Sequence, residues 1–156
     1  MRSGEIGDLW VRGPSLASCY WNRPGLTAER MRDGWFFTGD KYYADVDGYL
    51  WYAGRSDDMF RVSGEWVSPF EVESALVAHA AVLEAAVVPY EDENKLIKPK
   101  ACVVLKSGWA PGEELACELQ QHVRERLAGY KFPRKVEFWE ELPKTATGKI
   151  QRYKLR

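Results

Sequence analysis

RSDDMFRVSG, residues 55–64, lies between two parts of the sequence that are patterned differently. Charged residues at its start favour a solvated segment, and the Ser63-Gly64 pair at its end permits unusual backbone angles. The stretch neither alternates cleanly like a strand nor repeats like a helix. We therefore interpret it as a junction between a domain of residues 1–56 and a second domain of residues 57–156.

The residues before the junction predict short strands joined by turns. Glycine bounds or interrupts each of three strand-like stretches: GDLWVRG (7–13), GWFFTGD (34–40) and ADVDGYLWYAGR (44–55). The last of these predicts a hairpin that turns at Asp47-Gly48. RPGLTAERMRDG (23–34) predicts a Pro-Gly turn and a short helix that is capped by Thr27 and has Glu29 and Arg30 in its first turn. This first part is β-rich in character.

The residues after the junction predict a mixture of helices and strands. SPFEVESALVAH (68–79) has the signals of a helix start, with Ser68 as the cap, Pro69 in the first helical position and Glu71 completing a capping box. Further elements follow: strands at 83–90, 99–106 and 134–142, an amphipathic helix at 112–127, and a loop with a short basic helix at 143–156. The expected fold is α+β, with a three-stranded sheet and flanking helices in the second part.

Composition narrows the range of functions. Lys and Arg number 22 and Asp and Glu number 23, for a net charge of -1, which argues against a nucleic-acid binder. No apolar run is long enough for a signal peptide or a membrane span. The cysteines and histidines are scattered, which favours a reducing cytoplasm and argues against a metal site: Cys19, Cys102, Cys117, His79 and His122.

Three short motifs follow one another in the sequence: TGD (38–40), GRSDD (54–58) and PKTATGKIQR (143–152). Each is weak alone, but their order and spacing resemble the adenylate-forming enzymes, which include acyl-CoA synthetases, aryl-CoA ligases and peptide-synthetase adenylation domains. GDKYYADVDGYLWYAGRSDDMFRVSGEWVSPFEVE (39–73) and AVLEAAVVPYEDENKLIKPKACVVLK (81–106) are most similar to the benzoate-CoA ligase group.

The resemblance implies a two-step reaction with ATP, Mg²⁺ and coenzyme A. An aromatic or other small carboxylic acid is first joined to AMP, and the acyl group then passes to the thiol of coenzyme A. The family's large N-terminal domain, with its phosphate loop and acyl pocket, has no counterpart in these residues. We therefore expect a fragment, in which a β-rich remnant of that domain precedes the small C-terminal domain, and which is inactive without the missing N-terminal domain. No metal ligand is assigned, and neither nucleic acid nor a membrane is expected as a partner.

The resemblance also gives roles to residues near the junction. Asp40 would accept hydrogen bonds from the ribose hydroxyls, Arg55 would reach the ribose and phosphates, and Asp57 would be the hinge between the two domains. Without the other motifs, Asp40 would be read as a surface-turn residue, Arg55 as part of a surface salt bridge, and Asp57 as a solvated linker acid.

Lys149 is the residue that the resemblance makes catalytic. Adenylation brings a carboxylate against an α-phosphate, and an ammonium group delivered there would offset the repulsion between these anions. Small residues beside Gly148 suggest a supple loop. TGK here lacks the remaining glycines of a phosphate-binding P-loop. The alternative is an ordinary basic tail.

Two further sets are implied for coenzyme A. Ser63, Gly64 and Trp66 match the loop that lines the pantetheine channel, or else form a simple β-turn. Tyr130 and Arg134, in YKFPRK (130–135), would hold the nucleotide phosphates, or else belong to a solvated strand edge. Two other functions remain open: loading of a carrier protein and, for the fragment alone, non-catalytic binding of coenzyme A.

Overall fold

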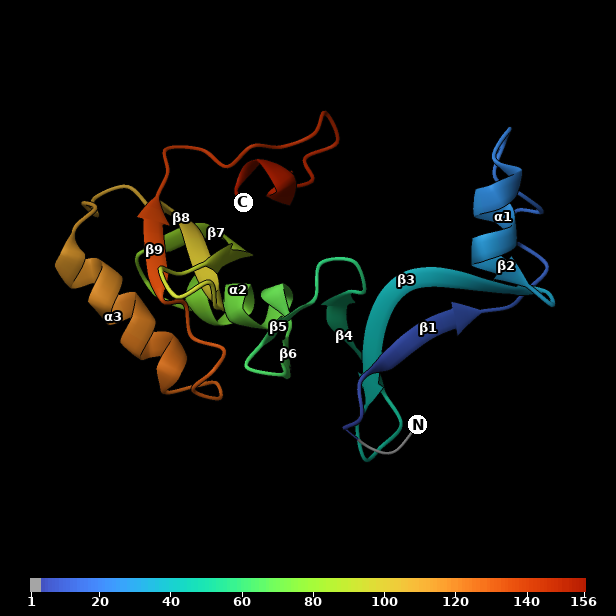
Figure 1. The fold of residues 1–156 in the computed structure, drawn as a ribbon, viewed down its shortest axis with the longest axis horizontal. Helices are drawn as coiled ribbons and strands as arrows, with labels where there is room; N and C mark the ends of the chain where they lie inside the picture. Colours follow the sequence, from blue (N-terminus) through green and yellow to red (C-terminus); the bar gives the residue numbers. More distant parts are fainter. Residues whose placement is uncertain (1–3) are drawn as a thin grey trace. The chain divides into compact units, whose positions relative to one another are not determined.

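The computed structural model describes residues 4–156, and the chain forms two compact units. The first unit ends at Asp58, and the second comprises Met59–Arg156. Figure 1 shows the first unit in blue and teal and the second in green to red.

The first unit is a four-stranded antiparallel sheet with one short helix. Its elements are β1 (Gly7–Val11), α1 (Pro24–Arg30), β2 (Met31–Arg32), β3 (Trp35–Ala44) and β4 (Leu50–Arg55). The long strand β3 pairs with each of the other three strands, and Figure 1 shows β1 alongside it. The β-rich character predicted for this part is confirmed.

The β3–β4 hairpin is confirmed, but its loop is longer than a two-residue turn. Ala44 pairs with Leu50, so five residues form the loop between them. The carboxylate of Asp45 accepts hydrogen bonds from the amides of Asp47 and Tyr49 at 3.0 and 2.9 Å, and from Trp51 Nε1 at 2.7 Å. An aspartate that folds back onto the backbone in this way replaces the tight turn that the sequence suggested.

The start of α1 corrects one sequence expectation. Pro24 occupies the first helical position, where its fixed φ suits a helix and its missing amide is not needed. Thr27 therefore lies inside the helix, where its hydroxyl donates to the carbonyl of Arg23 and accepts from the amide of Tyr20, both at 3.0 Å. The predicted Thr27 cap is wrong, and Arg30 belongs to the last turn of α1.

The second unit is α+β, as expected, and contains a three-stranded sheet. Its elements are β5 (Phe60–Val62), β6 (Glu65–Val67), α2 (Pro69–Val77), β7 (Val82–Glu91), β8 (Ile97–Leu105), α3 (Glu113–Arg124), β9 (Lys135–Phe138) and the 3₁₀ helix η1 (Arg152–Lys154). β7 and β8 are antiparallel, whereas β8 and β9 are parallel because α3 makes the crossover between them. Ser68 caps α2 as predicted, since its hydroxyl accepts the amide of Glu71 at 3.3 Å.

The two faces of this sheet pack against different parts of the chain. On one face, alternate residues such as Val87 and Val103 pack with α2, α3 and the β5–β6 hairpin. On the other face, Val88 and Val104 pack with Leu142 and Leu155, which come from the C-terminal tail. We call these the helix face and the tail face.

The β5–β6 hairpin lies within the stretch that the sequence analysis interpreted as a junction. Phe60 and Val62 are buried on the helix face, while Arg61 between them is exposed. A three-residue alternation of buried and exposed side chains is too short to be recognised as a strand in the sequence, especially directly after a run of charged residues. The expectation that residues 55–64 lack a strand is therefore wrong for Phe60–Val62.

Candidate functional site

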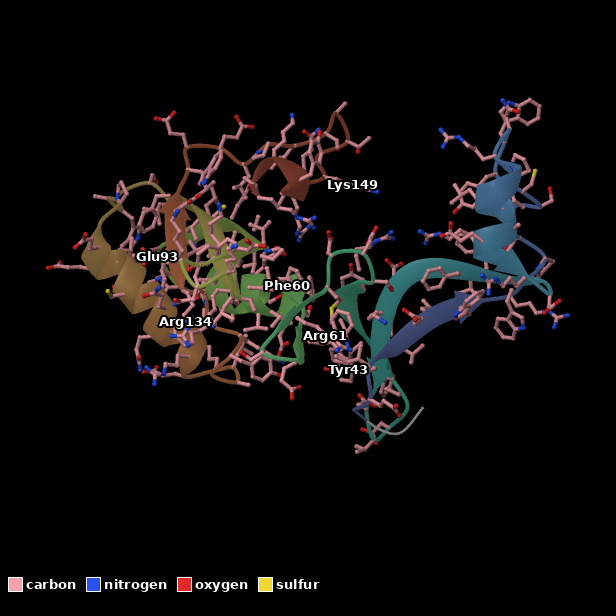
Figure 2. All side chains as sticks on the ribbon, in the orientation of Figure 1. Tyr43, Phe60, Arg61, Glu93, Arg134 and Lys149 are labelled. Atoms are coloured by element: carbon pink, nitrogen blue, oxygen red, sulfur yellow. The ribbon has the colours of Figure 1, made fainter. Side chains whose placement is uncertain are left out.

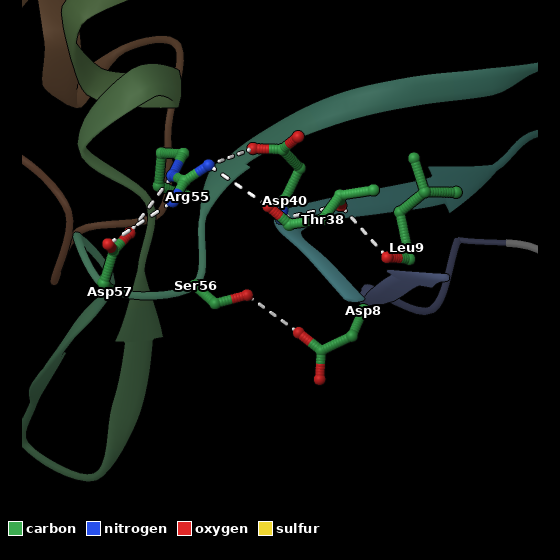
Figure 3. Close-up of polar contacts among 7 residues, drawn as sticks. All are labelled: Asp8, Leu9, Thr38, Asp40, Arg55, Ser56 and Asp57. Atoms are coloured by element: carbon green, nitrogen blue, oxygen red, sulfur yellow. Dashed lines mark hydrogen bonds and ion pairs between the residues drawn. The ribbon is translucent and has the colours of Figure 1, made fainter. Parts of the chain in front are cut away.

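Arg55 binds carboxylates on two sides of its guanidinium group (Figure 3). Nη1 donates to Asp40 Oδ1 at 3.0 Å and to the carbonyl of Thr38 at 3.3 Å. Nε and Nη2 donate to the two carboxylate oxygens of Asp57 at 3.2 and 3.4 Å. The structure thus brings together Asp40, Arg55 and Asp57, three of the residues singled out in the sequence.

The β3–β4 ladder positions this cluster. Asp40 lies directly opposite Arg55, and the register shifts just beyond them, between Lys41 and Tyr42. The Thr38 hydroxyl accepts the amide of Asp40 and donates to the carbonyl of Leu9 in β1, both at 3.0 Å. The backbone that carries Asp40 is therefore fixed to a neighbouring strand.

Gly39 permits the close approach of two guanidinium groups. Its φ of +77° lies in the left-handed region, and a Cβ there would lie 2.8 Å from Arg30 Nη1 and 3.1 Å from Arg55 Nη2. Sequence reasoning did not identify Arg30 as a neighbour of this cluster. Its position depends on α1, and no motif in the sequence marks it.

The opposite charges of Arg55 and its two carboxylate partners largely neutralise one another. Partial burial raises the pKa of Asp57, but the hydrogen bonds and the charge of Arg55 outweigh this effect and hold the pKa below its ordinary value. The hydrogen bond with Asp57 raises the pKa of Arg55. Asp40 Oδ2 has no hydrogen bond within residues 4–156, so it remains available to a ligand hydroxyl. The arrangement suits hydroxyl donors better than phosphates, because two carboxylates already neutralise Arg55.

Ser63 and Gly64 form the tip of the β5–β6 hairpin. Both have positive φ, 52° and 90°, which is the signature of a two-residue type I′ turn. Trp66 pairs with Arg61 across the hairpin, and the guanidinium carbon of Arg61 lies 4.6 Å from the centre of the Trp66 ring. The side chain of Trp66 is half exposed. The hairpin therefore presents a cation, an aromatic ring and an uncovered turn to solvent.

Tyr130 and Arg134 lie on either side of Phe132. Tyr130 and Phe132 pack against the core of the helix face, whereas Arg134 is exposed and places its guanidinium carbon 4.2 Å from the centre of the Phe132 ring. Arg124 approaches the same ring at 5.7 Å. Sequence reasoning missed Arg124, which α3 brings close to this segment.

Lys149 lies in a hydrogen-bonded hairpin. Thr145 donates its amide to the carbonyl of Lys149 at 2.8 Å, and the Thr145 hydroxyl accepts the amide of Lys149 at 3.1 Å. Gly148, with a φ of +81°, closes the turn through a 2.9 Å bond to the carbonyl of Thr145. The segment that carries Lys149 is thus a hydrogen-bonded turn. The Lys149 ammonium has no hydrogen bond or ion pair within the described residues.

Figure 2 shows Lys149 and Arg134 at separate places on the second unit. Lys149 projects from the tail and away from the sheet, whereas Arg134 lies beside α3. The Gly64 turn belongs to a hairpin that packs on the helix face, whereas Ile150, next to Lys149, packs on the tail face. Within the second unit, Lys149 is therefore carried beside the tail-face core, whereas the Gly64 turn belongs to a hairpin on the helix face.

The two histidines are neighbours, which the sequence analysis did not foresee. The rings of His79 and His122 are 4.9 Å apart, between α2 and α3, and His79 Nε2 lies 3.0 Å from Glu118 Oε1. Within residues 4–156 there is nevertheless no group of three His, Cys, Asp or Glu side chains placed to hold a metal ion.

Two other features of the described chain lie outside the predicted site. A cavity of about 310 Å³ in the first unit is lined by Leu16, Met31 and Trp35 among others, and by none of the predicted site residues. None of the helices formed by residues 4–156 is both long and apolar enough to cross a bilayer.

A family of known proteins matches this fold and these motifs. Residues 71–149 match the AMP-binding enzyme C-terminal domain, and the chain belongs to that family. The resemblance to adenylate-forming enzymes is thereby confirmed.

Two curated relatives that resemble almost the whole chain are ligases of aromatic acids. The chain is 59% identical over 154 residues to the benzoate–CoA ligase of Thauera aromatica, with 99% of the chain and 29% of that protein covered. It is 51% identical over 153 residues to the 4-hydroxybenzoate–CoA/benzoate–CoA ligase of Rhodopseudomonas palustris, covering 97% of the chain and 28% of that protein. The chain thus spans less than a third of the length of these relatives.

Two solved structures of CoA ligases are also similar to the chain over its whole length. The crystal structure of an anthranilate CoA ligase in complex with anthranoyl-AMP matches the whole chain and 30% of its own, with a TM-score of 0.94 and 51% identity. A benzoate CoA ligase from Burkholderia xenovorans matches with a TM-score of 0.91 and 51% identity, over the whole chain and 31% of its own.

Proposed function

We propose that this chain is the C-terminal part of an ATP-dependent aryl-CoA ligase of the benzoate type. The carboxylate of the acid attacks the α-phosphate of ATP, which gives acyl-AMP and pyrophosphate. The thiol of coenzyme A then attacks the acyl carbon, which gives the thioester and releases AMP. The names of the relatives support benzoate or a substituted benzoate as the acid. The acid would bind in a part of the protein outside these residues.

Asp40 and Arg55 would bind the nucleotide. Asp40 Oδ2 would accept a ribose hydroxyl, while Arg55, bound to Asp40 and to Asp57, would hold that carboxylate in place. Asp57 lies within two residues of the boundary between the compact units, which supports a role as hinge.

The observation that carries the proposal is the placement of Lys149 and the Gly64 turn on opposite faces of the second unit. A single orientation of this unit could not present both faces to one reacting carbon. We propose that the unit presents the tail face during adenylation and the helix face during thioester formation, with Asp57 absorbing the change in backbone angles. Lys149 would then stabilise charge that develops between the carboxylate and the α-phosphate.

Coenzyme A would bind on the helix face. The uncovered Gly64 turn allows a thin pantetheine arm to pass close to the backbone, beside Ser63 and Trp66. Arg134, together with Tyr130, would hold the nucleotide end of coenzyme A by charge and by stacking. Mg²⁺ would enter as a complex with ATP, and no step proposed for these residues depends on it.

Changing Lys149 to Ala in the full-length ligase tests the division of labour. We expect carboxylate-dependent ATP–pyrophosphate exchange to fall by about 10²–10³-fold, because a preorganised charge at the reacting phosphate is lost. Thioester formation from preformed acyl-AMP should stay within about twofold. Lys154→Ala removes a nearby tail lysine and should spare both steps. An equal loss of both half-reactions in Lys149→Ala would contradict the proposal.

The isolated chain supports a second, narrower function. Because it spans less than a third of its relatives, it would bind coenzyme A, or a separate N-terminal domain, without turnover of its own. Loading of a carrier protein would use the same residues.

We propose a cytoplasmic location, which the three free cysteines support.

A further inference from the structure

The tail that carries Lys149 is attached to the rest of the second unit at both ends of its hairpin. On one side, Leu142 is buried in the core of the tail face, and Lys144 Nζ lies 2.7 Å from Glu84 Oε1 of β7. On the other side, Leu155 is buried in the same core. The hairpin itself is closed by a 2.8 Å bond from the amide of Gln151 to the carbonyl of Pro143.

A partly buried ion pair lies directly after the hairpin. Arg152 Nη2 contacts both carboxylate oxygens of Glu73, at 2.8 and 2.7 Å. Glu73 belongs to α2, on the opposite face of the sheet from the tail, and its side chain is 12% exposed. The ion pair therefore joins the tail to the helix face around the edge of the sheet.

Glu73 also binds that edge directly. β7 is an edge strand, and the amide of Val87 donates to Glu73 Oε1 at 2.8 Å. An unpaired edge amide needs an acceptor, and a carboxylate buried to provide one needs a positive partner. Arg152 supplies that partner only if the tail adopts this path. The pair thus fixes the path of the chain three residues beyond Lys149.

From these contacts we infer that Glu73 and Arg152 are positioning residues for Lys149, which hold its hairpin so that the ammonium group moves with the second unit as one body. The inference rests on the proposed role of Lys149 in adenylation. Neither residue would touch the substrate. Loss of the pair would free one end of the hairpin, and a displacement of about 1 Å at a reacting group lowers rates by up to about 10²-fold.

The test compares two glutamates of the same helix. Glu73→Gln keeps an oxygen that can accept the Val87 amide but removes the charge that holds Arg152. Glu71→Gln is the matched control, because it breaks the ion pair between Glu71 and Lys131, in which Lys131 Nζ lies 2.6 Å from Glu71 Oε2. Neither of these residues belongs to the tail. In the full-length ligase, we expect Glu73→Gln to lower the turnover number of ATP–pyrophosphate exchange by about 10–100-fold, with the KM for ATP and the thioester step within about twofold. Glu71→Gln should leave exchange within about twofold.

A double variant and a direct structural readout separate positioning from simple loss of stability. Because Glu73→Gln and Arg152→Gln each break the same contact, the double variant should lose no more exchange activity than either single variant. Hydrogen exchange at the Gln151 amide reports the hairpin itself, and Glu73→Gln should accelerate it at least tenfold while the Val103 amide in the sheet is unchanged.

Two results would overturn the inference: unchanged exchange at the Gln151 amide in Glu73→Gln, or equal losses of activity in Glu73→Gln and Glu71→Gln. Failure of the proposed function looks different. In that case Lys149→Ala itself would leave adenylation intact, whereas the Gln151 amide would still report whether the ion pair holds the hairpin.

Discussion

Asp40 and Arg55 show how two residues that are unremarkable alone become a site. Each lies in a short motif, and their direct opposition in the β3–β4 ladder brings the motifs together. Their ion pair is only part of the arrangement, because Arg55 also binds Asp57 and approaches Gly39. A glycine with left-handed φ at that point makes room for the guanidinium groups.

Gly39→Ala should therefore disrupt the cluster. A Cβ at this φ is strained, and it would collide with Arg30 and Arg55, so we expect the free energy of unfolding to fall by about 1–3 kcal/mol. Urea denaturation of the chain measures this. Gly25→Ala is the control, since its Cβ would meet nothing within 4 Å and its φ is ordinary, so it should be neutral or slightly stabilising. Equal stability of the two variants would refute the steric argument.

Single residues were predictable where a motif marked them and not where the fold alone placed them. Asp40, Arg55 and Lys149 were found from the sequence. Arg124 beside Phe132 was not, because the contact depends on how the chain turns back after α3. The Glu73–Arg152 pair was not, because its two residues are 79 positions apart in the sequence. The roles proposed for the marked residues stay predictions until tested.

Helices and strands were predictable where capping and periodicity agree. Ser68 and Pro69 start α2 as expected. The strands β7, β8 and β9 of the three-stranded sheet lie where apolar runs predicted them. The errors occurred where two signals compete. Pro24-Gly25 was read as a turn, although Pro24 begins α1, and the brief alternation of β5 was hidden by the charges before it.

The packing of α2 against α3 makes stability depend on pH. Burial lowers the pKa of His122, as does the positive charge of Arg126, while the carbonyl of Ala75 and the charge of Glu125 oppose this shift. His79, which also faces the ring, adds to the lowering. Since the pKa in the folded state lies below the ordinary 6.5, the unfolded state binds more protons as the pH falls through that value.

We therefore expect the free energy of unfolding to decrease as the pH is lowered from 6.5 towards 5, and to be insensitive to this group above 7.5. Urea titrations across that range measure the slope. His122→Gln keeps a donor for the carbonyl of Ala75 without titrating, so it should flatten the slope. A slope as steep in the variant as in the parent would assign the pH dependence to other groups.

At the scale of the whole molecule, the two units can be compared by their apolar cores and by the aromatic side chains that they expose. The second unit has cores on both faces of its sheet. Both units expose large aromatic side chains, including Trp35 and Trp51 of the first unit at 45% and 53% and Trp66 of the second unit at 50%. Exposed aromatic surface of this kind is typical of an interface. We expect it to be covered by the rest of the proposed ligase.

The chain alone should accordingly lack adenylating activity. We expect no carboxylate-dependent ATP–pyrophosphate exchange above background with benzoate, because the acyl pocket and the phosphate loop would lie outside these residues. Adding the separately expressed N-terminal domain of the same ligase is the positive control. Genuine exchange by the chain alone would show that the missing part is dispensable.

The order of elements along the chain has a consequence for synthesis on the ribosome. Every residue that packs on the helix face is made before or together with β9, the last strand of the sheet. The residues that cover Val88 and Val104 are translated only later. A nascent chain paused before Leu142 would carry a formed sheet with one bare apolar side, a surface that chaperones recognise and that aggregates readily. Truncations that remove Leu142 or Leu155 should therefore reduce the yield of soluble protein in cells, even though they leave α2 and α3 intact.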